Sequence, residues 1–346
     1  MPRYFSFFEQ IENNIGTMEV DEIKQNFDLN LKERKIFIPR LHPGIFLYRA
    51  RKLGPTFKKE EQIAREQLIY PPKNIASLGR VNRAGAAVFY ASTHKEAVFF
   101  ELPDLTQGDE LILTFWKTTE SMLVNNIGYT ERVFQQLGAT RAVPAWATPS
   151  QRQLQANEST VGLSVYPQEM IDDLLSHDDD REINEAISKL FTKKVDLDEA
   201  FWYKLTVALA EFHLGRAASK NISIAGILYP SIRVSANADN IALLPWFVDK
   251  HLEFRKAVHI RVKERSEAAF NIEYLDAAHE FDVDGRLNWL GRVRQLKLTN
   301  VPAGYKLVGK AATGPDDDGD YLIAQDGTEV HWVFTDGATG KTLQME

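Results

Sequence analysis

The chain has 346 residues, of which 44% are hydrophobic, so it can bury the core of one large domain with additions or of two smaller domains. Its formal net charge of −7 argues against a broad basic surface for nucleic acid or anionic membranes, but leaves room for a local arginine cluster that binds a small anion. Cysteine is absent, which excludes disulfides, thiolate catalysis and cysteine-bound zinc.

The beginning of the chain does not predict a signal peptide, because residues 1–9 reach an acidic side chain before a long apolar run forms. The most apolar stretch, residues 241–248, is far shorter than the ~20 residues of a membrane-spanning helix. We therefore expect no membrane helix, and the lack of cysteine is consistent with a cytoplasmic location.

The N-terminal part of the chain predicts helices that flank a strand. Residues 1–40 have apolar side chains at roughly helical spacing and predict two short helices. Residues 46–51 predict a strand that carries Arg49 and Arg51, and residues 60–68 predict a polar helix that ends before two prolines.

Residues 79–101 concentrate a loop, an aromatic hydroxyl and an acid more tightly than any other stretch. A basic, glycine-bounded loop at 79–85 leads into an apolar strand that carries Tyr90. Residues 93–96 have the pattern of a capping box and predict a short helix that ends at Glu101. We therefore expect one carboxylate at a defined place beside a cationic loop.

The rest of the chain predicts both helices and strands. We expect, in order, a strand at 109–117, helices at 123–137 and 169–175, a loop with a short strand at 157–166, an amphipathic helix after the capping box at 196–199, and strands at 222–229 and 259–263. Beyond about residue 265, short strands and turn residues predict a small β-rich region.

The arginines of this chain suit a phosphate group, because a guanidinium can donate two parallel hydrogen bonds to phosphate oxygens. Arg49 and Arg51 precede the two loop arginines, Arg80 and Arg83. The loop lacks the Gly-Lys-Ser/Thr ending of a P-loop and the spacing of a dinucleotide fingerprint. The alternative is that the arginines are solvated, but Arg49, next to apolar residues in a predicted buried strand, favours a functional role.

Glu101 follows four apolar residues and is expected to be partly buried. A buried carboxylate needs either a partner or a catalytic task. A salt bridge to one of the arginines is the alternative interpretation, and both can hold in the resting protein.

Acidic clusters elsewhere do not predict a metal site. If Gly319 of the DDDGD stretch at 316–320 took the sixth position of a calcium-binding loop, Gly314 and Gln325 would stand where liganding acids are required, so we predict a hairpin turn. The acids at 178–180 predict a helix N-terminus. The eight histidines form no HExxH pattern, and we expect no metal.

Several features together resemble the RES-domain family, which is named for an Arg, a Glu and a Ser in this order. They are Arg49, the loop 79–85 with Arg80 and Asn82, Tyr90, Glu101, and the turn at 229–231 that ends in Ser231. The resemblance covers about residues 40–265 and includes the stretch 239–243. RES domains are known as the toxin halves of toxin–antitoxin pairs whose antitoxins carry a helix-turn-helix.

The resemblance implies an α+β fold like that of ADP-ribosyltransferases, in which two small, mostly antiparallel sheets with flanking helices form a cleft for NAD. It divides the chain into an N-terminal helical extension (1–40), a RES domain (41–265) with an insertion at about 118–195, and a β-rich C-terminal appendage (266–346).

The resemblance also implies an activity, since members degrade NAD by hydrolysis or phosphorolysis and a few attach ADP-ribose to proteins. Glu101 is expected to stabilise positive charge at the nicotinamide ribose, and Arg49 to bind the pyrophosphate. Tyr90 is expected to stack on the nicotinamide or to bond to the ribose, and Ser231 to orient the ribose or the amide. Arg80 and Asn82 are expected to contact the second phosphate and the adenosine.

NAD is thus the expected substrate, with no metal cofactor. Two alternatives are an ADP-ribosyltransferase that acts on a protein and a non-catalytic nucleotide-binding module. The expected partner is a protein antitoxin with an Xre-like helix-turn-helix, and we expect no direct binding to nucleic acid or membrane. Whether the chain forms a homo-oligomer is left open.

Overall fold

The computed structural model describes residues 3–31, 38–54, 63–102, 104–144, 178–195, 199, 201–219, 221–266 and 270–289, and beyond them six strands between 294 and 344. The chain divides into two compact units, each assembled from segments that are far apart in sequence. The first unit consists of Met1–Tyr48, Ile69–Glu101 and Lys117–Glu253, and the second of Arg49–Leu68, Leu102–Trp116 and Phe254–Glu346.

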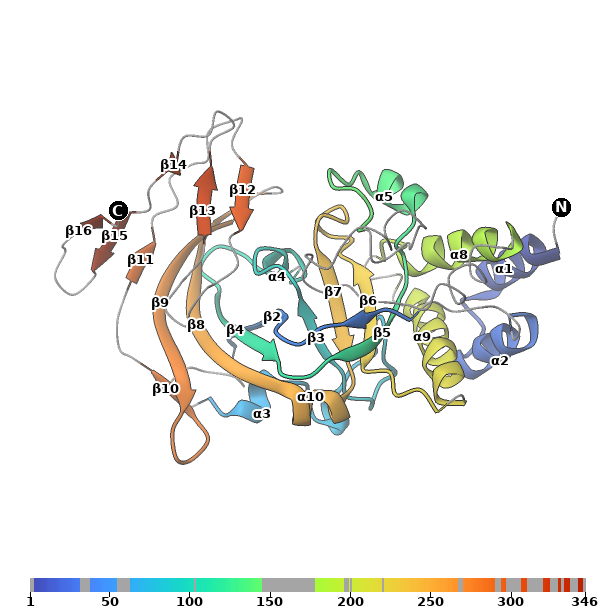
Figure 1. The fold of residues 1–346 in the computed structure, drawn as a ribbon, viewed down its shortest axis with the longest axis horizontal. Coiled ribbons are helices and arrows are strands. Elements are labelled where there is room, and N and C mark those ends of the chain that lie inside the picture. Colours follow the sequence, from blue (N-terminus) through green and yellow to red (C-terminus); the bar gives the residue numbers. More distant parts are fainter. Residues whose placement is uncertain are drawn as a thin grey trace. The chain divides into compact units, whose positions relative to one another are not determined.

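The α+β prediction is confirmed. Helices accompany a mixed, mostly antiparallel, open sheet with the hydrogen-bonded order β1-β5-β6-β7-β3-β2-β4-β8-β9-β10 (Figure 1). β5 and β6 run parallel, whereas β6 and β7 run antiparallel. Within the described residues, no helix has both the length and the apolar character that a bilayer crossing requires.

The strands of the first unit surround a buried hairpin-like pair. β6 (Gly226–Pro230) and β7 (Asp239–Leu243) are buried along their whole length. Around them lie β1 (Arg40–Leu41), β5 (Met122–Asn126), β3 (Phe89–Ser92) and the beginning of β2 (Phe46–Lys52), together with the short helices η2 (Lys73–Ile75), α4 (Ala97–Phe100), α5 (Glu131–Leu137) and α10 (Pro245–His251).

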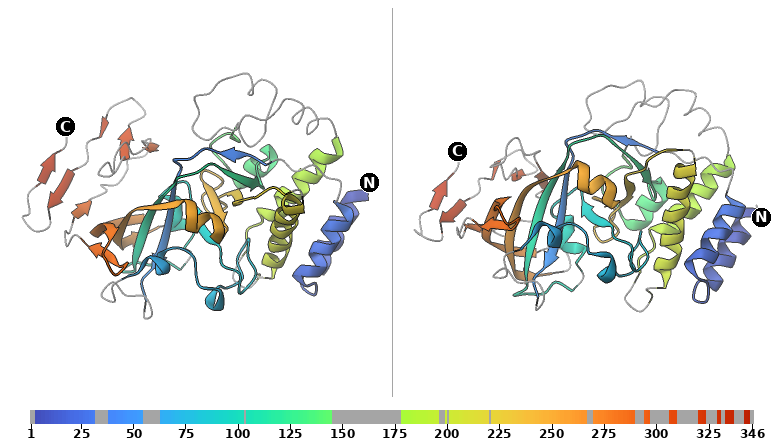
Figure 2. Two further views of the ribbon diagram at one scale, coloured as in Figure 1. Left: turned by 60° about the horizontal axis from the view of Figure 1, so that its bottom comes forward. Right: turned by 90° about the horizontal axis from the view of Figure 1, so that it is seen from below.

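Four longer helices complete this unit and lie beside one another (Figure 2): α1 (Arg3–Asn14), α2 (Val20–Asn30), α8 (Asp178–Phe191) and α9 (Trp202–Ser219). Their apolar faces form one core with Ile227 and Tyr229 of β6, in which Phe27 packs against Phe212 and Phe191 packs edge-on against Tyr229. Each such side chain stabilises the fold by roughly 1.5–3 kcal/mol when fully buried. The core therefore ties the helices to the strand that leads to Ser231.

The second unit is mostly β-structure. Its main strands are β4 (Glu110–Thr118), β8 (Leu252–Arg265), β9 (Phe270–Phe281) and β10 (Leu287–Trp289), with the short helix α3 (Arg65–Leu68). Two small sheets follow, of β11 (Arg294–Leu296), β15 (Val333–Asp336) and β16 (Thr342–Gln344), and of β12 (Lys306–Gly309), β13 (Asp320–Ile323) and β14 (Glu329–Val330).

Many of the elements predicted from the sequence are confirmed. The two N-terminal helices, the strands at 46–51 and 109–117, the helix N-terminus at the 178–180 acids and the helix that begins at Trp202 are all present. The predicted elements at 157–166 and 169–175 lie outside the described residues. So do residues 316–319 of the predicted turn, but Asp320 begins β13, and the strands on either side, β12 and β13, pair antiparallel.

The prediction of a helix at 123–137 was wrong in its first half. Residues 122–126 form β5, which pairs with β1 on one side and β6 on the other, and Val124 and Asn125 are fully buried. The helix begins only after Thr130, whose side chain caps it by accepting from the Val133 amide. Pairing on both sides outweighed the helical pattern, as tertiary contacts often do.

The predicted capping box at 93–96 was also wrong. The N-cap of α4 is Glu96, whose side chain makes no capping bond. Thr93 is instead held by the sheet, because its backbone N–H donates to the carbonyl oxygen of Asp239 at 2.9 Å. The helix is a single turn, and Glu101 lies at its C-terminus.

Two further boundaries differ from the prediction. β6 begins at Gly226 instead of Ile222, and the polar helix begins at Arg65, since Ile63 and Ala64 are not helical. Residues 60–62, the first part of the predicted helix, lie outside the described part of the chain. The ends of helices and strands depend on tertiary partners that the local sequence pattern does not contain.

Glu110 in the second unit should make the stability of the fold depend on pH. Arg261 donates to its Oε1 from Nε and Nη2 at 2.9 and 2.6 Å, and His259 Nε2 lies 2.7 Å from its Oε2. Burial works to raise the pKa of Glu110, but the hydrogen bonds from Arg261 and His259 outweigh it and hold the pKa below its ordinary value.

A group with a lowered pKa stabilises the fold above its unfolded pKa, and this stabilisation is lost as the pH falls through the folded pKa. We therefore expect Glu110→Gln to lower the free energy of unfolding at neutral pH and to lose this difference from wild type at pH ~3. Urea unfolding at both pH values measures it. Glu264→Gln on the exposed end of β8 is the control, and an equal pH response of the two variants would contradict the prediction.

Candidate active site

The centre of the candidate site is the carboxylate of Glu101. Its Oε1 accepts two hydrogen bonds, from Ser231 Oγ at 2.5 Å and from Asn240 Nδ2 at 2.7 Å. The two donors are 130 and 139 positions away in sequence, and both are buried. The structure thus brings together Glu101 and Ser231, two of the residues singled out in the sequence.

Three neighbouring strands position these side chains. Ser231 directly follows β6, Asn240 lies on β7, and Glu101 ends the helical turn after β3. In the register of the pairs, Asn240 lies opposite Tyr229 on one side and opposite Ser92 on the other. The site is therefore built on the most buried part of the sheet, which favours a rigid geometry.

Glu101 forms no ion pair with the described part of its own unit. Among the described residues, it accepts hydrogen bonds only from these two neutral donors, both at the same oxygen, and no hydrogen bond to its Oε2 is formed. The alternative interpretation was a salt bridge to one of the four arginines; of these bridges, the ones to Arg80 and Arg83 are not formed. The site thus holds a fixed carboxylate whose second oxygen and negative charge can act on a ligand.

Neither a family model nor a curated protein matches this sequence.

The loop at 79–85 is held by contacts among residues 77–90. Asn82 is buried, and its Nδ2 donates to the carbonyl oxygens of Ser77, Arg83 and Ala86 at 2.8–3.0 Å. Tyr90 donates from its hydroxyl to Asn82 Oδ1 at 2.7 Å and accepts from the Val81 amide at 2.8 Å. These bonds favour a loop-shaping role for the polar groups of Asn82 and Tyr90.

Gly79 shows how closely this loop is packed. A Cβ there would lie 2.5 Å from Asn82 Oδ1 and 2.7 Å from the Tyr90 hydroxyl. Any side chain would displace the network, which explains a glycine at the start of the loop.

The two loop arginines also bind protein groups. Arg80 Nη1 donates to the carbonyl oxygen of Phe191 at 2.5 Å, at the C-terminus of α8, where a cation is favourable. Arg83 forms ion pairs with Glu211 at 2.6 Å and with Asp21 at 2.5 Å. In this structure both guanidinium groups stabilise helix packing instead of forming an open phosphate cradle.

Arg49 lies on β2, one residue after Tyr48, which is in register with Ser92 of β3. Its side chain is half-buried, and its backbone carbonyl accepts from Thr114 Oγ1 at 2.9 Å. Arg49 belongs to the second unit, whereas Glu101, Ser231 and Asn240 belong to the first.

Asn240 is the site residue that sequence reasoning missed. The only signal was its place in the stretch 239–243, which resembles the RES family, and no local pattern distinguished it from a structural asparagine.

Tyr229, which the sequence analysis placed in a turn, lies on β6 beside the site. Burial raises the pKa of Tyr229, and the neighbouring Tyr90 and Glu101 raise it further, so its hydroxyl keeps its proton.

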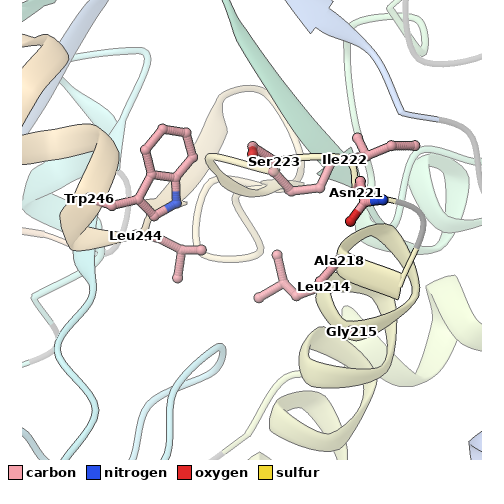
Figure 3. A pocket seen from close by; sticks show the side chains of 9 residues that line it. Leu214, Gly215, Ala218, Asn221, Ile222, Ser223, Leu244 and Trp246 are labelled. Carbon is pink, nitrogen blue, oxygen red and sulfur yellow. The ribbon is translucent and has the colours of Figure 1, made fainter.

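A hollow of about 700 Å³ lies at the other end of β6, five residues or about 16 Å along the strand from Ser231. Figure 3 shows the indole of Trp246 on one side of it and the chain at 221–223 on the other. Its lining is mostly apolar: Leu214, Gly215, Ala218, Asn221, Ile222, Ser223, Ile224, Leu244 and Trp246. It has no acidic side chain and belongs to a different part of the unit from the Glu101 carboxylate.

Within the described residues, no three His, Asp or Glu side chains are placed to hold a metal ion together.

Tyr90→Phe should reveal the cost of opening the loop network. The change leaves the Val81 N–H and Asn82 Oδ1 without the hydroxyl that pairs with both, so we expect the free energy of unfolding to fall by about 1–3 kcal/mol. Urea unfolding measures it. Tyr70→Phe, which removes an exposed bond to Asp249, is the matched control, and an equal loss in both variants would contradict a special role of the Tyr90 network.

Proposed function

We propose that this protein cleaves the bond between nicotinamide and ribose in NAD. The observation that carries the proposal is the Glu101 carboxylate, which Ser231 and Asn240 hold through one oxygen and which forms no ion pair with the described residues of its unit. Such a group is suited to stabilise positive charge that develops on a bound substrate.

The chemistry of NAD needs only one carboxylate. Ordinary glycosidases use a second carboxylic acid to protonate the leaving oxygen. Nicotinamide instead leaves from a cationic ring: both electrons of the C–N bond pass to the ring nitrogen, and the leaving group becomes neutral. A single acid beside neutral donors therefore matches this bond better than it matches an O-glycoside.

Each site residue then has a defined task. Glu101 would accept a hydrogen bond from the nicotinamide ribose through Oε2 and stabilise the positive charge at the anomeric carbon, mainly in the transition state. Ser231 and Asn240 would hold that carboxylate in place. Arg49 would bind the pyrophosphate, for which a guanidinium fork is well shaped.

The loop residues keep a supporting part in this proposal. Arg80, Asn82 and the hydroxyl of Tyr90 would shape the wall of the site through their internal bonds, while the Tyr90 ring would contact the nicotinamide or ribose. Contact of Arg80 and Asn82 with the phosphates, as the RES resemblance implies, would require these bonds to open.

The acceptor completes the reaction at the anomeric carbon. Water would add with loss of a proton to give ADP-ribose, and inorganic phosphate would add to give ADP-ribose phosphate. The resemblance to RES domains further suggests an ADP-ribosyltransferase-like core and a growth-arresting toxin with an Xre-like antitoxin.

Proton NMR of NAD incubated with the purified protein, with and without phosphate, tests the proposal. Free nicotinamide is the expected product, and a product that forms only with phosphate would identify phosphorolysis. Intact NAD under both conditions would refute both reactions. Labelled ADP-ribose retained on a protein would then favour the transferase, and NAD binding without cleavage would favour a nucleotide-binding module.

A further inference from the structure

A second set of hydrogen bonds anchors the residue next to Asn240. Arg141 donates from Nη2 and Nη1 to the two carboxylate oxygens of Asp239 at 2.5 and 3.1 Å, and the Tyr129 hydroxyl donates to Asp239 Oδ1 at 2.9 Å. Asp239 is buried. Since successive residues of a strand point to opposite faces, Asp239 anchors the start of β7 while Asn240 turns towards Glu101.

The same arginine also holds the loop that joins the two donors of Glu101. The loop 231–239 runs from Ser231 to the first residue of β7. Within it, the carbonyl oxygen of Ala236 accepts a hydrogen bond from Arg141 Nε at 2.5 Å. Ser235 and Ala236 have φ values of 53° and 58°, in the left-handed region that favours glycine. Such strain persists only where the surroundings enforce it, and it clusters at functional sites.

A neighbouring contact reinforces this clamp. The side-chain oxygen of Asn237 accepts hydrogen bonds from the backbone N–H and the hydroxyl of Thr140, at 2.9 and 2.8 Å. The segment before Arg141 thus docks on the same loop from outside the sheet.

We propose that Arg141 is a positioning residue for the Glu101 site: by fixing Asp239 and the loop 231–239, it makes Ser231 and Asn240 converge on one oxygen of Glu101. A guanidinium fork defines both the distance and the orientation of its carboxylate, which an ammonium group does not. The kinetic consequence rests on the NAD cleavage proposed above, whereas the structural consequence does not.

Arg141→Ala should lower kcat for nicotinamide release about ten- to a hundredfold with little change in KM, because small displacements of a catalytic group affect the transition state most. Arg141→Lys should recover only a minor part of the kcat that Arg141→Ala loses. Added guanidinium at low millimolar concentration should restore activity to Arg141→Ala, a response that a merely structural role would not give. Arg132→Ala, which removes an exposed arginine of α5, should behave as wild type throughout.

A readout without catalysis separates this proposal from the proposed function. The side-chain amide protons of Asn240, assigned by comparison with Asn240→Asp, should shift in Arg141→Ala and return with guanidinium, whether or not NAD is cleaved. If Arg141→Ala does not fold, Asp239→Asn keeps the size of the side chain, breaks the bidentate pair and should shift the same resonances. Unshifted amide protons, or wild-type kcat in a folded variant, would overturn the proposal.

Discussion

Glu101→Gln is expected to lower kcat for nicotinamide release by at least about 100-fold while KM for NAD changes little. Gln keeps an oxygen that can accept from Ser231 and Asn240, so the site stays assembled. Under the proposed function, the change removes the negative charge that would face the anomeric carbon and would act mainly in the transition state. Steady-state assays of nicotinamide release, with single-turnover measurements for the chemical step, test it.

The matched control for this experiment is Glu96→Gln. Glu96 is the N-cap of the same helical turn, but its side chain makes no capping bond, so wild-type activity is expected. Glu101→Asp keeps the charge and withdraws it by one methylene group, and its loss should lie between wild type and Gln. Wild-type kcat in a folded Glu101→Gln protein would eliminate the electrostatic role assigned to this residue.

Gly226→Ala is expected to cause the largest loss of stability. A Cβ at this position would lie 2.0 Å from the carbonyl oxygen of Ala242, a backbone atom of the paired strand β7. Because the obstacle is backbone, only separation of β6 from β7 can relieve the clash, and we expect the free energy of unfolding to fall by about 4 kcal/mol or more. Since β6 ends next to Ser231, activity should be lost as well.

Gly215→Ala provides the opposite expectation for the same substitution. Gly215 lies inside α9, and a Cβ there would meet nothing within 4 Å. Alanine is the better helix former, so the variant should be more stable than wild type by about 0.5–1 kcal/mol. Urea unfolding of both variants measures the two effects, and a stable Gly226→Ala protein would mean that β6 and β7 can pair with a side chain at this position.

Elements with a strong local pattern could be predicted from the sequence. α9 has apolar residues at helical spacing, and β4 has a run of mostly apolar, mostly buried residues. Local preference and burial agree in these segments. They disagree at β5, where an apolar stretch that continues into a genuine helix was read as helix throughout. The strands β1 and β6 that pair with it come from distant parts of the chain.

The candidate site, too, could be predicted only in part from the sequence. The RES resemblance pointed to Glu101 and Ser231, but not to Asn240, because a buried asparagine has no sequence pattern that separates structural from functional roles. The loop residues were read as ligand contacts because an arginine or asparagine in a glycine-bounded loop has the right chemistry. Their partners, the carbonyls of Phe191, Ser77, Arg83 and Ala86, can be seen only in the folded chain.

The sequence by itself determined the fold class, most of the regular elements and the position of a carboxylate at the end of one helical turn, because these depend on short-range spacing and composition. The tertiary structure alone decided which groups meet that carboxylate and which arginines are neutralised within the protein. The contacts that hold Glu101 join residues 130 and 139 positions apart. Their geometry depends on the register of β6, β7 and β3, and register is set by packing across the whole sheet.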